Sequence, residues 1–431
     1  MTRVRDAIII GAGPAGTATA ARLIQRGVRD VLVLEREAFP RDKPCGGGLT
    51  GHVDMALAAL DLELAVPALA ASAARIRFGS FDRVVALPRP VRVILRNAFD
   101  RSLAEQVQAR GVSIVFRQRV TRIGVGRDAV TIQTAAGDTL SARVVVGADG
   151  VGSVVRKRLR RQSRQAPHRL FMQVTEASRA VIPGAAVEML FDFTPMLSGV
   201  RGYAWAFPLT GGLTNVGVMH YPSQRCEPAE MLRTLRVAAA RHGVELPPRG
   251  TQGWPVWGYD PEAAIAGPRL LTVGDAAGID SLTGEGIAVA MEQAQIAGDA
   301  VARALQTGDV AFRDYARAIR TAAVGRELML DGWLAGKLYQ AGPGWQRWMR
   351  LLLFDRSFPE RFAARIAGME VLSDRKRRLM LQAIGRNLTG RGERRRRLAL
   401  AGAGFADPRE EFTVSRGLPP AGAPAEAVRP G

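Results

Sequence analysis

Six residues near the N-terminus have the types and spacing of a turn that binds a pyrophosphate. Gly11-Ala12-Gly13-Pro14-Ala15-Gly16 follows the apolar segment 7–10 and opens a helical pattern that ends before Gly27. Gly11 permits the tight turn, Gly13 lets the backbone approach the pyrophosphate, and Gly16 lets the helix pack closely on the strand. The helix N-terminus adds a partial positive charge that favours an anion.

An acidic residue stands where such a turn needs one. Glu35 closes a second apolar segment, 31–34, and follows Gly16 by 19 residues. At that place its carboxylate can accept a hydrogen bond from a ribose 2′-OH. The strand, turn, helix and acid together predict a Rossmann-type dinucleotide-binding unit. The alternative is a tight strand–helix turn that binds nothing.

Two further glycine-rich segments indicate that the dinucleotide is FAD. Residues 144–156 read VVVGADGVGSVVR and contain Asp149-Gly150, and residues 271–288 read LTVGDAAGIDSLTGEGIA. Asp275 follows a buried strand, where its carboxylate can accept from a ribityl hydroxyl. A helix that starts at Gly286 offers its N-terminus to the flavin or the pyrophosphate. An ordinary glycine-rich loop is the alternative.

At these segments the chain resembles the geranylgeranyl reductase family, within the wider group of FAD monooxygenase-like proteins, over roughly residues 5–310. The segment 43–50, KPCGGGLT, resembles the family's cysteine-glycine loop, and 202–208, GYAWAFP, resembles its YxWxFP motif. The segment 280–287 resembles DPLTGEGI, with Ser281 where proline is usual. Arg96 opens a segment, RNAFD, that resembles RxxFD, whose arginine points toward the FAD phosphates.

The resemblance implies an enzyme that reduces C=C bonds of a polyprenyl lipid, quinone or pigment side chain with reduced FAD. NADPH or reduced ferredoxin is the expected electron donor, because no second glycine-rich nucleotide-binding unit is visible. The expected catalytic residues are Cys45, Tyr203 and Trp205. The expected FAD-binding residues are Gly11, Gly13, Pro14, Ala15, Gly16, Glu35, Arg36, Cys45, Gly46, Gly47, Arg96, Val120, Asp149, Gly150, Gly274, Asp275, Gly284, Gly286 and Ile287.

The three expected catalytic residues each have a simpler interpretation. Cys45 is either a reactive thiol beside the flavin or a small residue in a glycine loop. Tyr203 and Trp205 alternate with alanines, so both rings share one face of a strand. They form either an aromatic core or the wall of a pocket for an apolar chain over the flavin.

Other functions remain open from the sequence. An aromatic hydroxylase that uses NAD(P)H and O₂ would need the same glycine-rich segments. A flavin halogenase has a similar strand motif, but its catalytic lysine has no obvious counterpart among the four lysines. A non-catalytic electron carrier needs an exposed flavin edge, which the aromatic strand argues against. The histidines 52, 168, 220 and 242 lack metal-ligand spacing, and we expect no metal.

The net charge of +20 is carried mostly by arginine. It reflects either a general use of arginine or a surface for anionic lipid, and no nucleic-acid-binding motif accompanies it. The cluster Arg156–Arg164 is either a solvated face or a patch for headgroups or a substrate diphosphate. Two cysteines fit a reducing cytoplasm, and no signal or membrane span is visible. We therefore expect a cytoplasmic protein, with peripheral membrane attachment as a possibility and an unknown oligomeric state.

The predicted fold is α/β, with a Rossmann-type FAD-binding domain, an inserted antiparallel-sheet substrate domain and a helical C-terminal region. The FAD-binding parts are expected at 1–72, 97–165 and 266–310. The substrate domain is expected at 73–96 and 166–265, with short strands that turn at Arg89-Pro90 and a hairpin at Gly211-Gly212. Residues 311–400 are basic and helical in pattern, and 401–431 resemble a disordered tail.

Overall fold

The computed structural model describes residues 3–160, 169–178, 187–221, 227–246, 251–339, 344–346, 348–349 and 357–373. Residues 374–400 of the predicted basic helical region 311–400, the predicted tail 401–431 and the residues Arg161, Arg164, His168 and Cys226 lie outside these ranges. None of the helices in the described ranges is long and apolar enough to cross a membrane.

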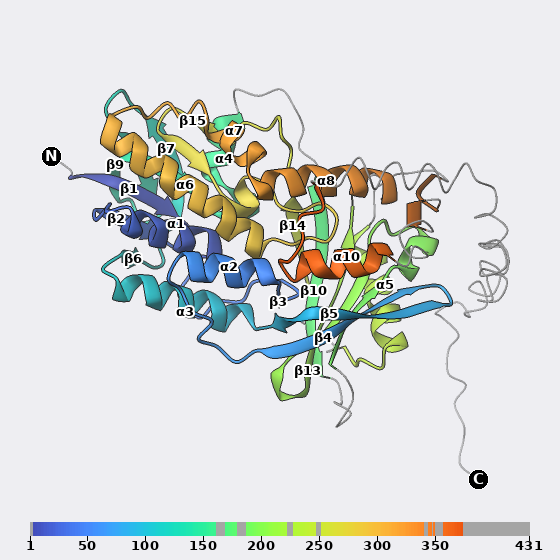
Figure 1. Ribbon diagram of the computed structural model, residues 1–431. Helices are drawn as coiled ribbons and strands as arrows, with labels where there is room; N and C mark the ends of the chain where they lie inside the picture. The colour runs from blue at the N-terminus through green and yellow to red at the C-terminus, as the bar shows by residue number, and fades with distance from the viewer. Residues whose placement is uncertain are drawn as a thin grey trace, which may run out of the picture.

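Within the described residues, the strands form two eight-stranded sheets, which we call sheet A and sheet B (Figure 1). The strands of sheet A are β1 Val4–Ile10, β2 Val31–Leu34, β6 Ser113–Val115, β7 Val120–Val125, β8 Val130–Thr134, β9 Thr139–Gly147, β15 Ala266–Gly267 and β16 Leu270–Thr272. The strands of sheet B are β3 Gly48–Leu49, β4 Leu69–Phe78, β5 Phe81–Val93, β10 Arg169–Ser178, β11 Glu188–Asp192, β12 Ala204–Pro208, β13 Leu213–His220 and β14 Gln252–Trp257.

The helices cover both sheets. They are α1 Pro14–Gln25, α2 Gly51–Ala59, α3 Arg96–Ala109, α4 Val154–Arg160, α5 Pro228–Arg241, α6 Ile287–Thr307, α7 Tyr315–Thr321, α8 Ala323–Leu338 and α10 Ser357–Ile366. Figure 1 shows α1 and α6 side by side along sheet A, and α8 and α10 beside sheet B.

Sheet A has the parallel centre that its apolar strands predict. β1 pairs in parallel with β2 and β9, and β16 pairs in parallel with β9. Ala7 and Ile9 pack into the core with α1, α3 and α6, whereas Ile8 and Ile10 pack into the core with β8 and α4. Both faces are covered, which explains why these strands are apolar throughout. β7, which the sequence analysis did not single out, pairs with β8.

Sheet B is antiparallel except for the parallel pair β11 and β4. The alternation in β12 places Tyr203 and Trp205 in a core with α8 and α10. Ala204 and Ala206 face the opposite way, into a core with α5. The small side chains therefore lie where a helix packs closely on the sheet. The predicted hairpin at Gly211-Gly212 joins β12 and β13, and both glycines have positive φ.

The turn predicted at Arg89-Pro90 is wrong. β4 and β5 form one long hairpin that turns at Gly79-Ser80, and Arg89-Pro90 lies inside β5. Ala71 pairs with Val91 and Ala73 with Ala86, so residues 87–90 form a bulge. Proline has no N–H for the ladder, and a bulge is one of the few places where a strand accepts it. β4 begins at Leu69 and β3 lies at 48–49, both before the expected boundary at residue 73.

Candidate functional site

The glycine turn sits between β1 and α1, beneath the segment that follows β9. A Cβ atom on Gly11 would lie 2.3 Å from the Ala148 carbonyl oxygen, and one on Gly16 would lie 1.8 Å from the Gly11 carbonyl oxygen. These two glycines are required by packing. A Cβ on Gly13 would meet only Arg41 and Asp100 side-chain atoms, at 3.3 and 3.9 Å. Gly13 therefore leaves its backbone open to a ligand.

Two arginines lie beside the start of α1. Arg96 makes two bonds of 2.8 Å to Asp100, and Arg41 Nη2 lies 3.1 Å from the same carboxylate. Burial lowers the pKa of Arg96, but Asp100 and Cys45 raise it by more. The net pKa of Arg96 therefore lies above the usual value. Arg41 was not singled out from the sequence, because a lone arginine in an arginine-rich chain carries no signal.

Glu35 is buried at the end of β2 and supports the turn. Its two carboxylate oxygens accept from Ala12 N at 2.8 Å and from Glu37 N at 3.0 Å. Each oxygen keeps a lone pair for a ribose hydroxyl. Arg36 is exposed and pairs with Glu37 at 3.4 Å, whereas Val120 is buried in β7.

The Asp149-Gly150 segment contacts the same turn and starts α4. Asp149 Oδ2 accepts from Val154 N at 2.7 Å, and Oδ1 is buried with no partner among the described residues. Burial raises the pKa of Asp149 to about 6. Gly150 has a φ of 73°.

The second glycine-rich segment lies opposite, between β16 and α6. Asp275 pairs with Lys43 at 2.8 Å. Burial raises the pKa of Asp275, but Lys43, Arg96 and Arg41 outweigh it, and the net pKa lies below the usual value. Gly286 caps α6 without a side-chain bond, and Ile287 is its first residue. Gly274 and Gly284 both have positive φ.

Arg156 corrects one expectation. The cluster 156–164 was expected to be a solvated face or an anion patch, but Arg156 is only 3% exposed. Its Nη1 donates to the Ala276 carbonyl at 2.6 Å, and its guanidinium lies 4.8 Å from the Trp257 ring centroid. Burial lowers its pKa to about 10. Arg156 therefore joins α4 to the Asp275 segment.

These features fit FAD. α1 and α6 each follow a glycine N-cap that makes no side-chain cap bond, so the N–H groups of their first turns are available to an anion or a flavin oxygen. Arg41 and Arg96 supply cations near the α1 end. The unpaired Asp149 Oδ1 is a buried acceptor that a ligand donor can satisfy.

The cysteine-glycine loop lies between the FAD-binding elements and the aromatic face of sheet B. Cys45 Sγ accepts from Gly47 N at 3.4 Å. Trp205 Nε1 donates to Asn215 Oδ1 at 2.9 Å, and Asn215 Nδ2 donates to the Cys45 carbonyl at 2.8 Å. A Cβ on Gly46 would meet Phe207 at 3.0 Å. Trp205 therefore stabilises the cysteine-glycine loop through Asn215.

An apolar cavity of about 100 Å³ lies between sheet B and helices α8 and α10. Tyr203, Leu282 and Thr283 form the end of its lining, and Tyr203 Oη donates to the Thr283 carbonyl at 2.5 Å. The rest is aliphatic and aromatic, from β4, β5, β11, α8 and α10, and includes Phe362 and Ala363. The structure thus places Tyr203 in the cavity wall, whereas Trp205 packs on the loop.

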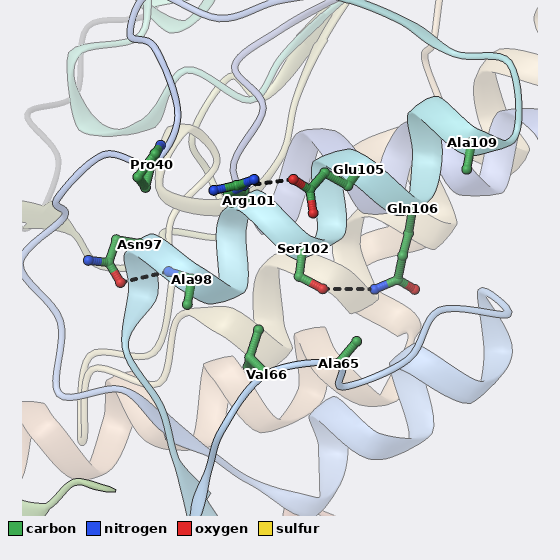
Figure 2. A pocket seen from close by; sticks show the side chains of 10 residues that line it. All are labelled: Pro40, Ala65, Val66, Asn97, Ala98, Arg101, Ser102, Glu105, Gln106 and Ala109. Carbon is green, nitrogen blue, oxygen red and sulfur yellow. Dashed lines mark hydrogen bonds and ion pairs between the residues drawn. The ribbon is translucent and has the colours of Figure 1, made fainter. Parts of the chain in front are cut away.

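A second hollow, of about 650 Å³, is lined by α3 together with Pro40 and Ala65-Val66 (Figure 2). Its polar side chains pair with one another: Arg101 with Glu105 at 2.7 Å, and Gln106 with Ser102 at 3.2 Å. Within the described ranges, no group of three metal-ligating side chains gathers.

Comparison with known families decides the class. Residues 5–329 match the family described as FAD binding domain. The chain belongs to this FAD-binding family. The glycine turn, the Asp149 segment and the Asp275 segment are all within the matched range.

The relatives narrow the class of FAD protein. The chain is 28% identical over 314 residues to a menaquinone reductase of Mycobacterium tuberculosis, covering 68% of this chain and 75% of that one. It is 27% identical over 311 residues to a digeranylgeranylglycerophospholipid reductase of Methanosarcina mazei, covering 68% and 74%. The protein is an FAD-dependent oxidoreductase related at low identity to such reductases.

The fold has a solved counterpart. A geranylgeranyl bacteriochlorophyll reductase-like protein of Thermoplasma acidophilum matches with a TM-score of 0.68 and 18% identity, over 93% of this chain and 99% of that one. This match shows the α/β fold with its second sheet and C-terminal helices.

Proposed function

We propose that the protein reduces isolated C=C bonds in the polyprenyl chain of a lipid, a quinone or a pigment. The observation that carries this proposal is the apolar cavity that ends at Tyr203 and at Leu282-Thr283, in the segment that leads to α6. An alkene chain needs apolar walls and no polar partner. The relatives named above act on substrates of this kind according to their names.

The chain's own residues would hold the reactants and keep water out. Arg41, Arg96 and the α1 N-terminus would bind the FAD pyrophosphate, and Glu35 the ribose. Cys45 and Gly46, supported by Asn215, would lie against the flavin ring. The cavity would hold the alkene dry beside it. Bound and reduced, FAD supplies a hydride.

The remaining partners are also part of the proposal. NADPH or reduced ferredoxin would reduce the flavin. The long isoprenoid substrate resides in membranes, and the net charge of +20 favours approach to an anionic membrane surface. Such a protein works in the cytoplasm at the membrane face.

The aromatic hydroxylase is the second candidate, and the cavity disfavours it. A small polar aromatic acid needs an arginine or hydroxyl clamp, but the Tyr203 hydroxyl is bonded to a backbone carbonyl. A halogenase needs a catalytic lysine, and Lys43 is paired with Asp275 at the FAD-binding end. A non-catalytic electron carrier has no use for an apolar cavity.

The test is anaerobic reoxidation of the reduced protein. We expect a prenyl quinone to restore the oxidised-flavin absorbance without O₂. Ala363 lines the cavity, and Ala363→Phe should fill it and slow this reoxidation by at least about tenfold while FAD stays bound. Ala364→Phe, on the same helix but outside the lining, is the matched control. Reoxidation that requires O₂ would favour the hydroxylase instead.

A further inference from the structure

The loop before α6 contains Glu285, and hydrogen bonds to Asp280 fix the conformation of this loop. Asp280 accepts from Leu282 N at 2.6 Å and from Thr283 N at 2.9 Å, and Gly284 has a φ of 74°. This folded loop presents Glu285 directly before Gly286, the cap of α6. Glu285 therefore stands two residues from the cavity wall at Thr283.

The Glu285 carboxyl group is bonded on one oxygen. Thr50 Oγ1, at the end of the cysteine-glycine loop, donates to Glu285 Oε1 at 2.5 Å. In the part of the chain that the structure describes, no bond engages Oε2. One oxygen is thus anchored beside the Cys45 loop, and the other is available to carry a proton.

The surroundings favour the neutral form of this acid. Burial raises the pKa of Glu285, and Asp280 raises it further. His52 on α2, Arg365 on α10 and the Thr50 hydroxyl lower it, but the net pKa lies above the usual value. A neutral carboxyl group is a proton donor that an apolar site tolerates.

The other two candidate proton donors nearby, Tyr203 and His52, already make hydrogen bonds to the protein. Tyr203 donates to the Thr283 carbonyl, and burial raises its pKa. His52 contacts Glu292 Oε1 at 3.1 Å through Nδ1 and the Arg365 carbonyl at 3.0 Å through Nε2. Neither ring nitrogen of His52 is free to face the cavity.

We propose that Glu285 is the proton donor for the reduction, an inference that rests on the proposed function. Glu285 gives its proton to one alkene carbon, while the other carbon takes a hydride whose source is the reduced flavin, which becomes oxidised flavin. The C=C π bond is lost and two C–H bonds form. Glu285 is left as a carboxylate and regains its proton from solvent.

The first test is single-turnover reduction of a prenyl quinone by the anaerobically reduced holoenzyme. Glu285→Gln keeps the shape but cannot donate a proton, so we expect a rate on the order of 100-fold lower with unchanged FAD content. Glu285→Asp should restore part of the rate. Glu262→Gln, at a carboxylate that is 68% exposed, is the control and should match the wild type.

The rates of the wild type and of Glu285→Gln distinguish a failure of the proposed function from a failure of the proton-donor assignment. If the wild-type protein is not reoxidised by the quinone, the proposed function fails. If the wild-type protein is reoxidised and Glu285→Gln has the same rate and pH profile, the proton-donor assignment fails.

The second test measures the protonation of Glu285 through the pH dependence of Tm, without any turnover of substrate. A glutamate whose folded pKa lies above its unfolded value of about 4.5 loses stability as pH rises between the two. Glu285→Gln removes this loss. The difference in Tm between Glu285→Gln and the wild type should therefore grow above about pH 4.5 and level off above the folded pKa. A difference that stays constant with pH would overturn the assignment.

Discussion

The charged side chains around the glycine turn and the Asp275 segment form pairs with one another: Lys43 with Asp275, and Arg41 and Arg96 with Asp100. The positions of Glu35 and Asp275 after buried strands could be predicted from the sequence, because each follows an apolar segment at a recognisable spacing. Arg41 and Lys43 could not, since the segment between β2 and the cysteine-glycine loop has no periodic pattern. Their place depends on the folded path of that loop.

At the level of single residues, we predict that a side chain at Gly13 prevents FAD binding. Gly13→Val places a branched side chain where the backbone must approach the pyrophosphate and where Arg41 lies 3.3 Å from the Cβ position. We expect FAD content to fall at least about tenfold, measured by flavin absorbance released on denaturation.

The matched control is Gly336→Val in α8, where a Cβ has open space around it. This variant should keep its FAD. Full FAD occupancy in Gly13→Val would contradict the pyrophosphate position.

At the scale of elements, sheet B is joined to α5 by a buried polar chain. His242 Nε2 donates to Asp192 Oδ2 at 2.9 Å, and Arg77 Nη1 donates to His242 Nδ1 at 2.9 Å. Asp192 Oδ1 accepts from Thr194 N at 2.9 Å. The chain links β4, β11 and the end of α5, three elements far apart in the sequence.

Removing the Asp192 charge should weaken this junction. Burial raises the pKa of Asp192, but bonds from His242 and Thr194 lower it more, so its folded pKa lies below 3.8. Its stabilisation is therefore present above the unfolded pKa and is lost as pH falls through the folded one. Asp192→Asn should lower the free energy of unfolding by about 2 kcal/mol at pH 7.

Thermal unfolding at pH 7 and near pH 3 measures this effect, with the exposed Asp314→Asn as control. The gap between wild type and Asp192→Asn should shrink at the lower pH. An equal gap at both values would show that the carboxylate charge contributes nothing.

Regular elements were more predictable than irregular ones. A clear pattern of apolar residues marks the strands β1, β2 and β12. The turn residues Gly211-Gly212 mark the hairpin. The bulge at Arg89-Pro90 has a turn composition, but the strands continue through it because β4 and β5 pair on both sides. Arg156 belongs to a basic run, yet Trp257 and the Ala276 carbonyl bury it. Local patterns do not contain such long-range contacts.

At the scale of the whole molecule, the C-terminal helices connect sheet B to the part of the chain that carries sheet A. Arg365 on α10 bonds Asp331 on α8 at 2.7 and 2.5 Å, and the Arg365 carbonyl lies 3.0 Å from His52 Nε2. The C-terminal helices thus close the cavity and contact the FAD-binding part. The sequence predicted their presence but not this position, which depends on pairing between distant residues.

If the cavity presents an alkene to reduced FAD, the alkene is reduced without oxygen. The most direct measurement is the mass of a prenyl quinone after anaerobic incubation with the reduced holoenzyme. We expect a product that gains two hydrogen atoms for each double bond reduced in the side chain. An unchanged side chain without O₂, together with a product that gains an oxygen atom when O₂ is admitted, would contradict it.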